Sequence, residues 1–240
     1  MIRIERVSER NFKKIVDMKL PPEQACFVAP NVVSLAQAWL YYKEARPFAI
    51  YSGEDVVGFL MLDWDENERT VGIWRFMIAP EYQQKGYGRM ALETVIKYVK
   101  DEGKFDLMHL DYVPNNMIAR DLYYSLGFRE NGKIEDNEII MTLQLTNQPK
   151  VGMLTADEDD IDDFLGLIET ENKGGRSIPK ELQDENFIRK MVEEGMVKRF
   201  TIMGETIGLA VGDTLFLKNE NQSFFLEAQL KYTKWNLGRE

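Results

Sequence analysis

The chain has 240 residues, of which 44% are hydrophobic and 29% charged, and this composition excludes collagen-like, low-complexity and mainly disordered proteins. Its length allows one large domain or two small ones. Forty acidic residues against 30 basic ones give a net charge of -10. A nucleic-acid partner is therefore not expected, because phosphate backbones require a basic surface. The excess of acid suits a cationic ligand, although solubility alone also explains it.

Cysteine and histidine are rare in this chain, and their scarcity narrows the chemistry. Cys26 has no second cysteine with which to form an internal disulfide, and His109 is the single histidine, so a metal site is not expected. Residues 1–5 lack the apolar core of a signal peptide, and no apolar run approaches the length of a membrane span. We expect a cytoplasmic protein without membrane contact.

The first third of the sequence predicts strands and helices in alternation. Residues 3–7 alternate like a strand, and the next helix places Phe12, Ile15 and Val16 on one face. A loop with three prolines leads to a second helix, which we expect to begin with a capping box at Ser34. Three antiparallel strands follow, over residues 47–51, 56–62 and 70–78.

The next segment predicts a parallel crossover. A helix over residues 88–102 is followed by a strand over 107–113, and a strand, a helix and a strand in succession favour parallel pairing. A further helix over 116–126 stops at Gly127. Strands over 128–130 and 138–145 complete the sheet. The sequence thus predicts an α+β domain with a mixed sheet over residues 1–146 and a polar linker over 147–150.

Residues 151–240 read as a smaller α+β half-repeat of the beginning of the chain. A short strand and an acidic helix lead to a break at Gly174 and Gly175, and a second helix follows. The hairpin over 48–60 then aligns with residues 200–210 after a two-residue gap, and we expect a final strand over 223–232. We interpret this pattern as a truncated duplication. The alternative is that two unrelated hairpins share the same turn residues.

One glycine-containing loop carries the strongest chemical signal. It lies between a predicted strand and a predicted helix and reads Gln83, Gln84, Lys85, Gly86, Tyr87, Gly88, Arg89. Glycines let the backbone approach a ligand closely, and the free amides at a helix start form an anion site suited to a pyrophosphate. The spacing is too short for a dinucleotide fingerprint or a P-loop, and a simple tight turn remains the alternative.

The surrounding motifs turn this loop into a recognisable ensemble. Residues 78–82 precede the loop, and Asn116, Ala119, Leu122, Tyr123 and Gly127-Phe128 follow at fixed spacing. Over residues 1–146 this ensemble resembles the GNAT acetyltransferase superfamily. The segments 27–39, 64–66 and 72–78 more narrowly resemble bacterial spermine/spermidine (diamine) acetyltransferases. The resemblance implies a GNAT-like acyl-CoA N-acyltransferase fold, acetyl-CoA as cofactor and direct attack by a primary amine, here a polyamine, in a ternary complex.

The resemblance also implies roles for single residues. Residues 83–89 would cradle the pyrophosphate, chiefly through backbone amides. The amide of Ile78 would stabilise the developing oxyanion at a splay between the fourth and fifth strands. Asn116 would bond the pantetheine arm or merely cap its helix. Tyr123 would protonate the departing thiolate, because a phenol with a pKa of about 10 can donate to a thiolate whose conjugate acid lies near 8.5.

The general base is less evident. Some polyamine acetyltransferases place a glutamate on the fourth strand, but Trp74 stands at that position here. Asp111 on the fifth strand and Asp63 at the end of the third are the substitutes, and each has a structural alternative. His109 shares a strand face with Asp111, and a packed histidine is the simpler interpretation.

The acceptor site is predicted from acidic and aromatic residues. An acidic turn containing Trp64 and Asp65 would attract a polycation, together with Asp63 and the loop residues Glu23 and Phe27. A solvated charged surface is the alternative. Residues 151–240 lack both motifs, so they should not bind coenzyme A. We expect them to support the structure or a homodimer, and a partial lid over the acceptor pocket is the alternative. A protein, amino-acid or aminoglycoside acceptor, or a non-catalytic acyl-CoA-binding module, stays open.

Overall fold

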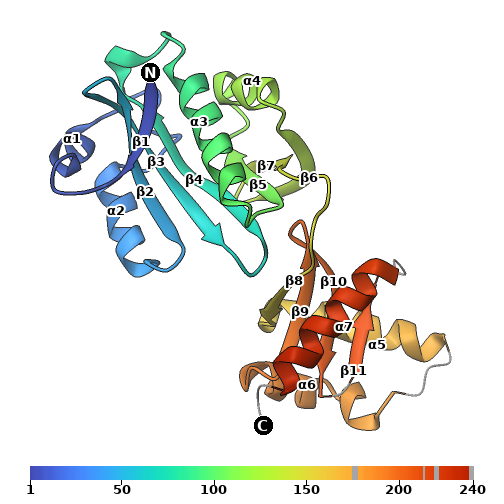
Figure 1. The fold of residues 1–240 in the computed structure, drawn as a ribbon. Coiled ribbons are helices and arrows are strands. Elements are labelled where there is room, and N and C mark those ends of the chain that lie inside the picture. Colours follow the sequence, from blue (N-terminus) through green and yellow to red (C-terminus); the bar gives the residue numbers. More distant parts are fainter. Residues whose placement is uncertain (175–177, 213, 219–221, 238–240) are drawn as a thin grey trace. The chain divides into compact units, whose positions relative to one another are not determined.

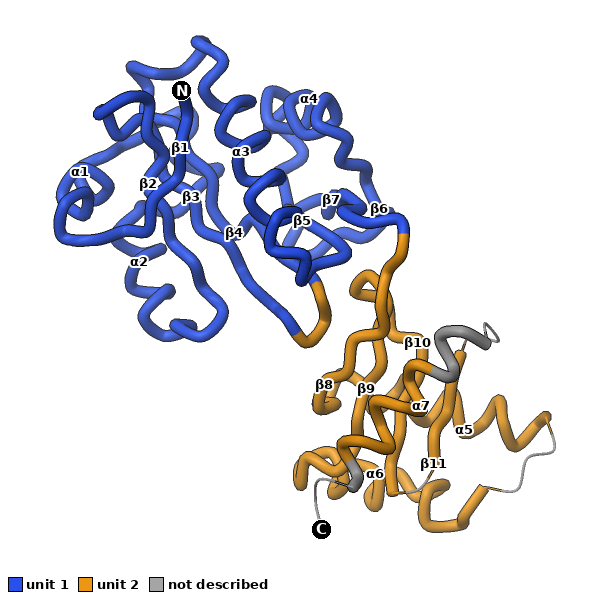
Figure 2. The backbone as a smooth tube through the Cα atoms, in the orientation of Figure 1, with its two compact units in different colours: residues 1–66, 70–147 blue, residues 67–69, 148–240 orange. Residues whose placement is uncertain are grey.

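The computed structural model describes residues 1–174, 178–212, 214–218 and 222–237, and the chain within it forms two compact units (Figure 2). The first unit comprises residues 1–66 and 70–147, and the second comprises 67–69 and 148–240. Each unit has a hydrophobic core of its own.

The first unit is built around one mixed sheet of seven strands (Figure 1). The strand order is β1-β2-β3-β4-β5-β7-β6, and the pairing of β4 with β5 is parallel, as the sequence predicts, whereas the other pairs are antiparallel. The elements in chain order are β1 (Ile2–Arg6), α1 (Phe12–Asp17), α2 (Asn31–Leu40), β2 (Ala45–Ser52), β3 (Asp55–Asp65), β4 (Thr70–Ile78), η1 (Pro80–Tyr82), α3 (Tyr87–Glu102), β5 (Leu107–Tyr112), α4 (Met117–Ser125), β6 (Arg129–Glu135) and β7 (Glu138–Gln144).

Helices cover both faces of this sheet (Figure 1). On one face α3 and α4 pack through Leu92, Val95 and Tyr123 against strand residues such as Leu60 and Met108. On the other face α1 and α2 pack over β2 and β3, with Ile15 fully buried. Side chains of a strand point alternately to its two faces, which is why the central strands are apolar at nearly every position.

The strands β4 and β5 pair over only part of their length. Their parallel register runs from Thr70 opposite Leu107 to Ile73 opposite Leu110 and then stops, although β4 continues to Ile78. Along that continuation β4 stays paired with β3, up to Ile78 opposite Gly58. The sheet therefore opens between β4 and β5 at this end, which confirms the splay expected from the sequence.

The second helix begins earlier than the sequence predicts. It starts at Asn31 with Pro30 as its N-cap, so Ser34 lies inside the helix and is buried instead of capping it. Proline has no amide hydrogen and a fixed φ, which makes it suited to a helix start. The polar side chains of Asn31 and Ser34 are buried, while those of Val32 and Val33 are exposed. Because polar residues are buried and apolar residues are exposed in this first turn, the hydrophobic pattern does not predict that the helix begins at Asn31.

The second unit contains a four-stranded antiparallel sheet in the order β11-β10-β9-β8. Its elements are β8 (Gly152–Thr155), η2 (Glu158–Asp160), α5 (Ile161–Lys173), η3 (Lys180–Gln183), α6 (Glu185–Glu193), β9 (Val197–Ile202), β10 (Glu205–Val211), β11 (Thr214–Leu217) and α7 (Gln222–Leu237). Of the predicted chain break, Gly175 lies outside the described residues. None of the described helices is long and apolar enough to cross a membrane.

The predicted strand over 223–232 is wrong, because α7 occupies this segment. Ala228 and Tyr232 are both buried and pack against the sheet, and Trp235 packs beside them. A spacing of four and then three residues places these side chains on one face of a helix. The segment therefore obeys the helical period, which the sequence interpretation missed.

Candidate active site

A cavity of about 930 Å³ lies in the first unit, at the end of the sheet where β4 and β5 separate. Its walls come from the loop between α1 and α2, the last residues of β4, the loop before α3, the end of β5, helix α4 and the β6–β7 turn. These segments are far apart in sequence, and the fold brings them to one site.

The loop before α3 has the backbone geometry of an anion site. Gly86 is the N-cap of α3 with φ of 79°, a left-handed conformation that glycine adopts without steric cost. The helical hydrogen bonds begin with the amide of Met90, which donates to the carbonyl of Gly86 at 3.1 Å. The amides of residues 87–89 precede this bond and remain available to a ligand.

Gly88 serves close packing at the same helix start. A Cβ atom at this position would lie 3.6 Å from Leu122, 3.8 Å from Ile78 and 3.9 Å from Phe76. These are ordinary contact distances, so a larger side chain here would fill the space between α3, β4 and α4. The two glycines therefore differ in role: Gly86 provides the conformation, and Gly88 keeps the gap narrow.

The polar side chains of this loop are mostly engaged within the protein. The Gln83 amide donates to Gln24 at 2.8 Å and to the carbonyl of Ile78 at 3.0 Å, so it joins the α1–α2 loop to β4. Lys85 donates to the carbonyl of Glu81 at 2.6 Å. The loop thus offers an anion mainly its backbone amides. Of its residues, those that line the cavity are Gln83, Gln84, Gly86, Gly88 and Arg89, whereas Lys85 and Tyr87 do not.

The amide of Ile78 faces the opening in the sheet. The neighbouring amide of Ala79 donates to Val57 on β3 at 2.9 Å. Amides along a strand alternate between its two edges. The amide of Ile78 therefore points away from β3, into the gap between β4 and β5. There it can donate a hydrogen bond to a carbonyl oxygen of a ligand.

Tyr123 on α4 lines the cavity, although only 8% of the residue's surface is exposed. Burial raises the pKa of its phenol to about 12, and the charges of Asp111 and Glu138 act in the same direction. Among the described residues the hydroxyl has no hydrogen-bond partner, and the ring rests edge-on against Phe128 at 6.1 Å. A protonated donor is thus held next to the cavity.

Asn116 caps α4, as its structural alternative requires. Its side-chain oxygen accepts a hydrogen bond from the amide of Ala119 at 3.2 Å. The residue also lines the cavity. The cap therefore fixes the start of the helix that carries Tyr123.

Carboxylates gather at the end of the cavity formed by β5 and the β6–β7 turn. Asp111 on β5 lies opposite Ile140 of β7, and Glu138 stands two residues earlier on β7. Glu138 is in turn paired with Glu135 of β6, and Asp136 lies in the turn between them. All four carboxylates line the cavity.

The surroundings of Asp111 and Glu138 raise the pKa of both carboxyl groups. Loss of solvent raises the pKa of Asp111, and the charge of Glu135 adds to the effect. Desolvation also raises the pKa of Glu138, as does the charge of Asp111, while the Arg75 guanidinium opposes the shift. Among the residues that the structure describes, no three potential ligands are arranged to hold a metal ion.

Sequence reasoning missed Glu135, Asp136 and Glu138. The sequence signal was the pair Asp136-Asn137 flanked by two glutamates. In the structure both residues of this pair have a positive φ, as a tight hairpin turn requires. Such a turn is a hairpin signal, but only the register of β5, β7 and β6 shows that it meets Asp111.

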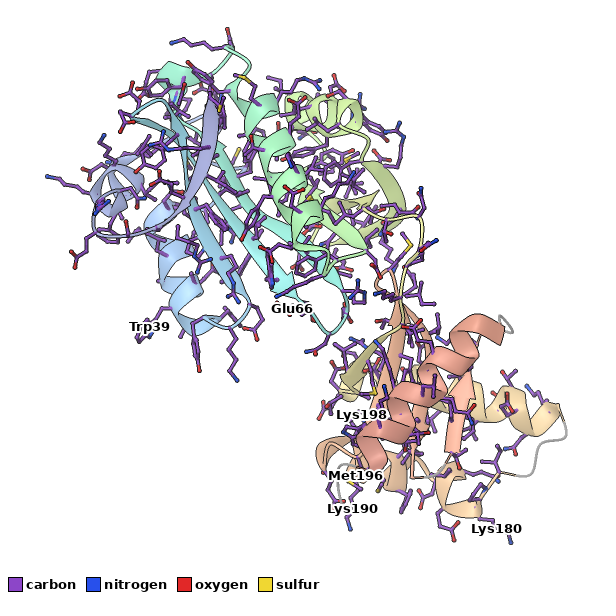
Figure 3. The ribbon with its side chains drawn as sticks, in the orientation of Figure 1. Trp39, Glu66, Lys180, Lys190, Met196 and Lys198 are labelled. Atoms are coloured by element: carbon purple, nitrogen blue, oxygen red, sulfur yellow. The ribbon has the colours of Figure 1, made fainter. Side chains whose placement is uncertain are left out.

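The predicted acidic turn after β3 does not join the cavity lining. Trp64 is 8% exposed and packs edge-on against Phe105 at 4.4 Å, so its ring offers no open face to a cation. This corrects the predicted substrate contact. Its indole nitrogen donates to Glu66, which also pairs with Lys104 at 2.7 Å. Figure 3 labels Glu66 at this end of the sheet.

Only one of the other residues predicted to bind the acceptor lines the cavity. Phe27 lines the cavity, whereas Glu23, Asp63 and Asp65 are outside its lining. Asp63 lies in a cross-strand row with Gly72 and His109. A Cβ atom on Gly72 would stand 2.8 Å from the imidazole, so this glycine makes room for the histidine ring. His109 is therefore packed against the sheet, as its simpler interpretation holds.

Comparisons with known proteins agree with this geometry. Residues 13–128 match the Acetyltransferase (GNAT) family. The chain is 31% identical over 153 residues to the spermine/spermidine N(1)-acetyltransferase of Bacillus subtilis strain 168, an alignment that covers 60% of this chain and 99% of that protein. The chain belongs to the GNAT family, and it is an acetyl-CoA-dependent N-acetyltransferase.

Solved structures share the fold. A spermidine N-acetyltransferase from Vibrio cholerae, solved with CoA and spermine, superposes with a TM-score of 0.52 at 17% identity, covering 60% of this chain and 95% of that one. An aminoglycoside acetyltransferase solved with coenzyme A gives the same TM-score at 13% identity, again with 60% and 95% coverage. At these identities the likeness concerns the fold alone.

Proposed function

We propose that this acetyltransferase acts on a polyamine of the spermine and spermidine type. The observation that carries the proposal is the cavity end lined by Asp111, Glu135, Asp136 and Glu138. Polyamines carry several ammonium groups at neutral pH, and clustered carboxylates attract them. The name of the Bacillus subtilis relative supports the same class of acceptor.

The cavity is suited to hold acetyl-CoA as the acetyl donor. The amides of residues 87–89 would bind the pyrophosphate, because they lie at a helix start whose dipole favours an anion. Asn116 would bond the pantetheine arm as it caps α4. The amide of Ile78 would bind the acetyl carbonyl and stabilise the negative charge that develops on its oxygen.

Proton transfer would be divided between two groups. Asp111 would take a proton from the acceptor ammonium, which frees the lone pair for attack on the acetyl carbon. Tyr123 would give its proton to the departing thiolate, and its raised pKa keeps the phenol protonated over the physiological range. Phe27 lines the cavity and would contact the methylene chain of the acceptor.

A panel of acceptors tests this function. We expect acetyl-CoA to be consumed fastest with spermine or spermidine, more slowly with putrescine, and least with lysine peptides and aminoglycosides. Catalytic efficiency with the polyamines should fall as salt rises, because screening weakens attraction between exposed charges. Preference for a lysine peptide or an aminoglycoside would replace the polyamine with that acceptor. Absence of turnover with every amine would favour a non-catalytic acyl-CoA-binding module.

We also propose that the enzyme is a cytoplasmic homodimer without nucleic-acid or membrane partners. The exposed and free thiol of Cys26 suits a reducing compartment. Helix α2 and the residues after it expose several large apolar side chains, and Trp39 projects away from the helix in Figure 3. Contact between two copies would remove such a surface from water. These exposed residues are Val32, Val33, Trp39, Leu40, Tyr41 and Tyr42.

A further inference from the structure

Glu138 lines the acidic end of the cavity, and the sheet register also places it beside Asp111, the proposed base. Asp111 lies directly opposite Ile140, and Glu138 is two residues from Ile140 on the same strand, so all three side chains point to the same face of the sheet. Diagonal neighbours of this kind on adjacent strands are separated by about 7 to 8 Å. Both carboxylates line the cavity that also contains Tyr123.

We infer that Glu138 and Asp111 act together as the proton acceptor of the reaction, so that the pair of carboxylates takes up one proton. The inference rests on the proposed function, since it concerns how the acceptor amine loses its proton. A single carboxylate in water is a weak base for an ammonium group, because their pKa values differ by about six units. Two carboxylates that lie near each other hold the first proton more strongly, because its uptake relieves their repulsion.

The electrostatic surroundings of the pair agree with this arrangement. Glu138 has a raised pKa from burial and from the charge of Asp111, and Asp111 has a raised pKa from loss of solvent. The phenol of Tyr123 senses both charges. The other charged or titratable groups that act on the pair come from three strands and a turn: His109 on β5, Arg75 on β4, Glu135 on β6 and Asp136 in the β6–β7 turn. Arg75 opposes the rise in the pKa of Glu138, and His109 opposes the rise in the pKa of Asp111.

The proton balance of the reaction is complete with these groups. The bound ammonium gives one proton to the pair and becomes a free amine. The amine nitrogen forms a bond with the acetyl carbon, and the bond between that carbon and sulfur breaks. The thiolate takes the proton of Tyr123, and the second proton lost by the nitrogen restores the phenol. The pair then releases its proton to solvent through the cavity.

The pH dependence of kcat/KM in Glu138→Gln tests the inference. This parameter reports groups of the free enzyme. Because the substitution removes one negative charge beside Asp111, we expect the acidic limb to move about one pH unit toward lower pH. We expect Glu138→Asp, which keeps the charge, to leave the limb near that of the unchanged enzyme. Asp101→Asn, an equal charge change at an exposed site on α3, is the matched control and should move nothing.

Further variants separate this inference from the proposed function. The double variant Asp111→Asn with Glu138→Gln should lose the limb and at least roughly 10²-fold in kcat/KM, while the shift of Tm by acetyl-CoA shows that it is folded. An unmoved limb in Glu138→Gln, with Asp111→Asn inactive, would overturn the pair and leave Asp111 as the sole base. A fully active double variant would overturn both the pair and the proposed base, whereas the acceptor panel alone decides the substrate class.

Discussion

Tyr123 combines the two properties that a general acid requires at this position. It is nearly fully buried, which raises its pKa to about 12 and keeps it protonated, and it still borders the cavity. Its hydroxyl is not bonded to any described side chain, so no competing partner has to be displaced before it can serve a ligand. The neighbouring Tyr124 is more exposed and interacts with Glu130 instead.

Replacement of Tyr123 with phenylalanine tests this assignment. We expect turnover to fall by roughly 10²-fold or more, because the thiolate would leave without a proton. The affinity for acetyl-CoA, measured by calorimetry, should change little since the ring remains. Tyr124→Phe is the matched control and should keep turnover within about twofold. If Tyr123→Phe behaved like this control, the tyrosine would have a packing role only.

At the scale of elements, the loop before α3 is defined by backbone conformation more than by its side chains. Gly86 lies at φ of 79° with open space where a side chain would stand. A β-branched residue in that conformation is strained, so the loop would have to rearrange. The strain falls directly on the amides that we assign to the pyrophosphate.

Gly86→Val should therefore abolish the rise of Tm that acetyl-CoA produces in the unchanged protein. A ligand that binds only the folded state stabilises it by about 2.7 kcal/mol at a concentration of 100 times Kd. Gly53→Val, which introduces the same residue at φ of 60° in the β2–β3 turn, is the control. It should lower the basal Tm but keep the ligand-induced rise. A preserved rise in Gly86→Val would remove this loop from the cofactor site.

Local patterns predict the elements of the first unit and the motifs of its site. The glycines of the α3 loop and the Asn116 to Tyr123 helix are contiguous in sequence, so their chemistry is legible without a structure. The acidic end of the cavity is different, because it forms through pairing of β5 with β7 and of β7 with β6. The burial of Trp64 likewise excludes it as a contact for the substrate, although its acidic sequence neighbours suggested an exposed position. Both outcomes depend on tertiary contacts.

At the scale of the whole molecule, the two units share an order of elements. In the first, β1, α1, α2, β2, β3 and β4 follow one another; in the second, β8, α5, α6, β9, β10 and β11 do so. Gly58 and Gly208 occupy aligned positions, and a Cβ atom on either would lie within 2.4 Å of a carbonyl oxygen of the next strand. We propose on this basis that residues 151–240 are a truncated GNAT-like half-repeat, which follows a domain over 1–146 and lacks a coenzyme A site.

We propose that the carboxylates around the β6–β7 turn select a polyamine for acetylation. Glu135 and Asp136 are exposed at this turn, and their charges act on Asp111 and Glu138, but neither accepts the proton in the proposed transfer. Their neutralisation should therefore weaken the binding of additional ammonium groups while the chemistry at the first one continues.

The most direct measurement is the ratio of kcat/KM for spermidine to kcat/KM for propylamine, at low salt, in the unchanged enzyme and in Glu135→Gln with Asp136→Asn. We predict that the unchanged enzyme prefers spermidine, and that the double variant loses at least roughly tenfold of this preference, with propylamine affected by less than about twofold. An equal effect on both amines, or an unchanged enzyme that does not acetylate spermidine, would contradict the account.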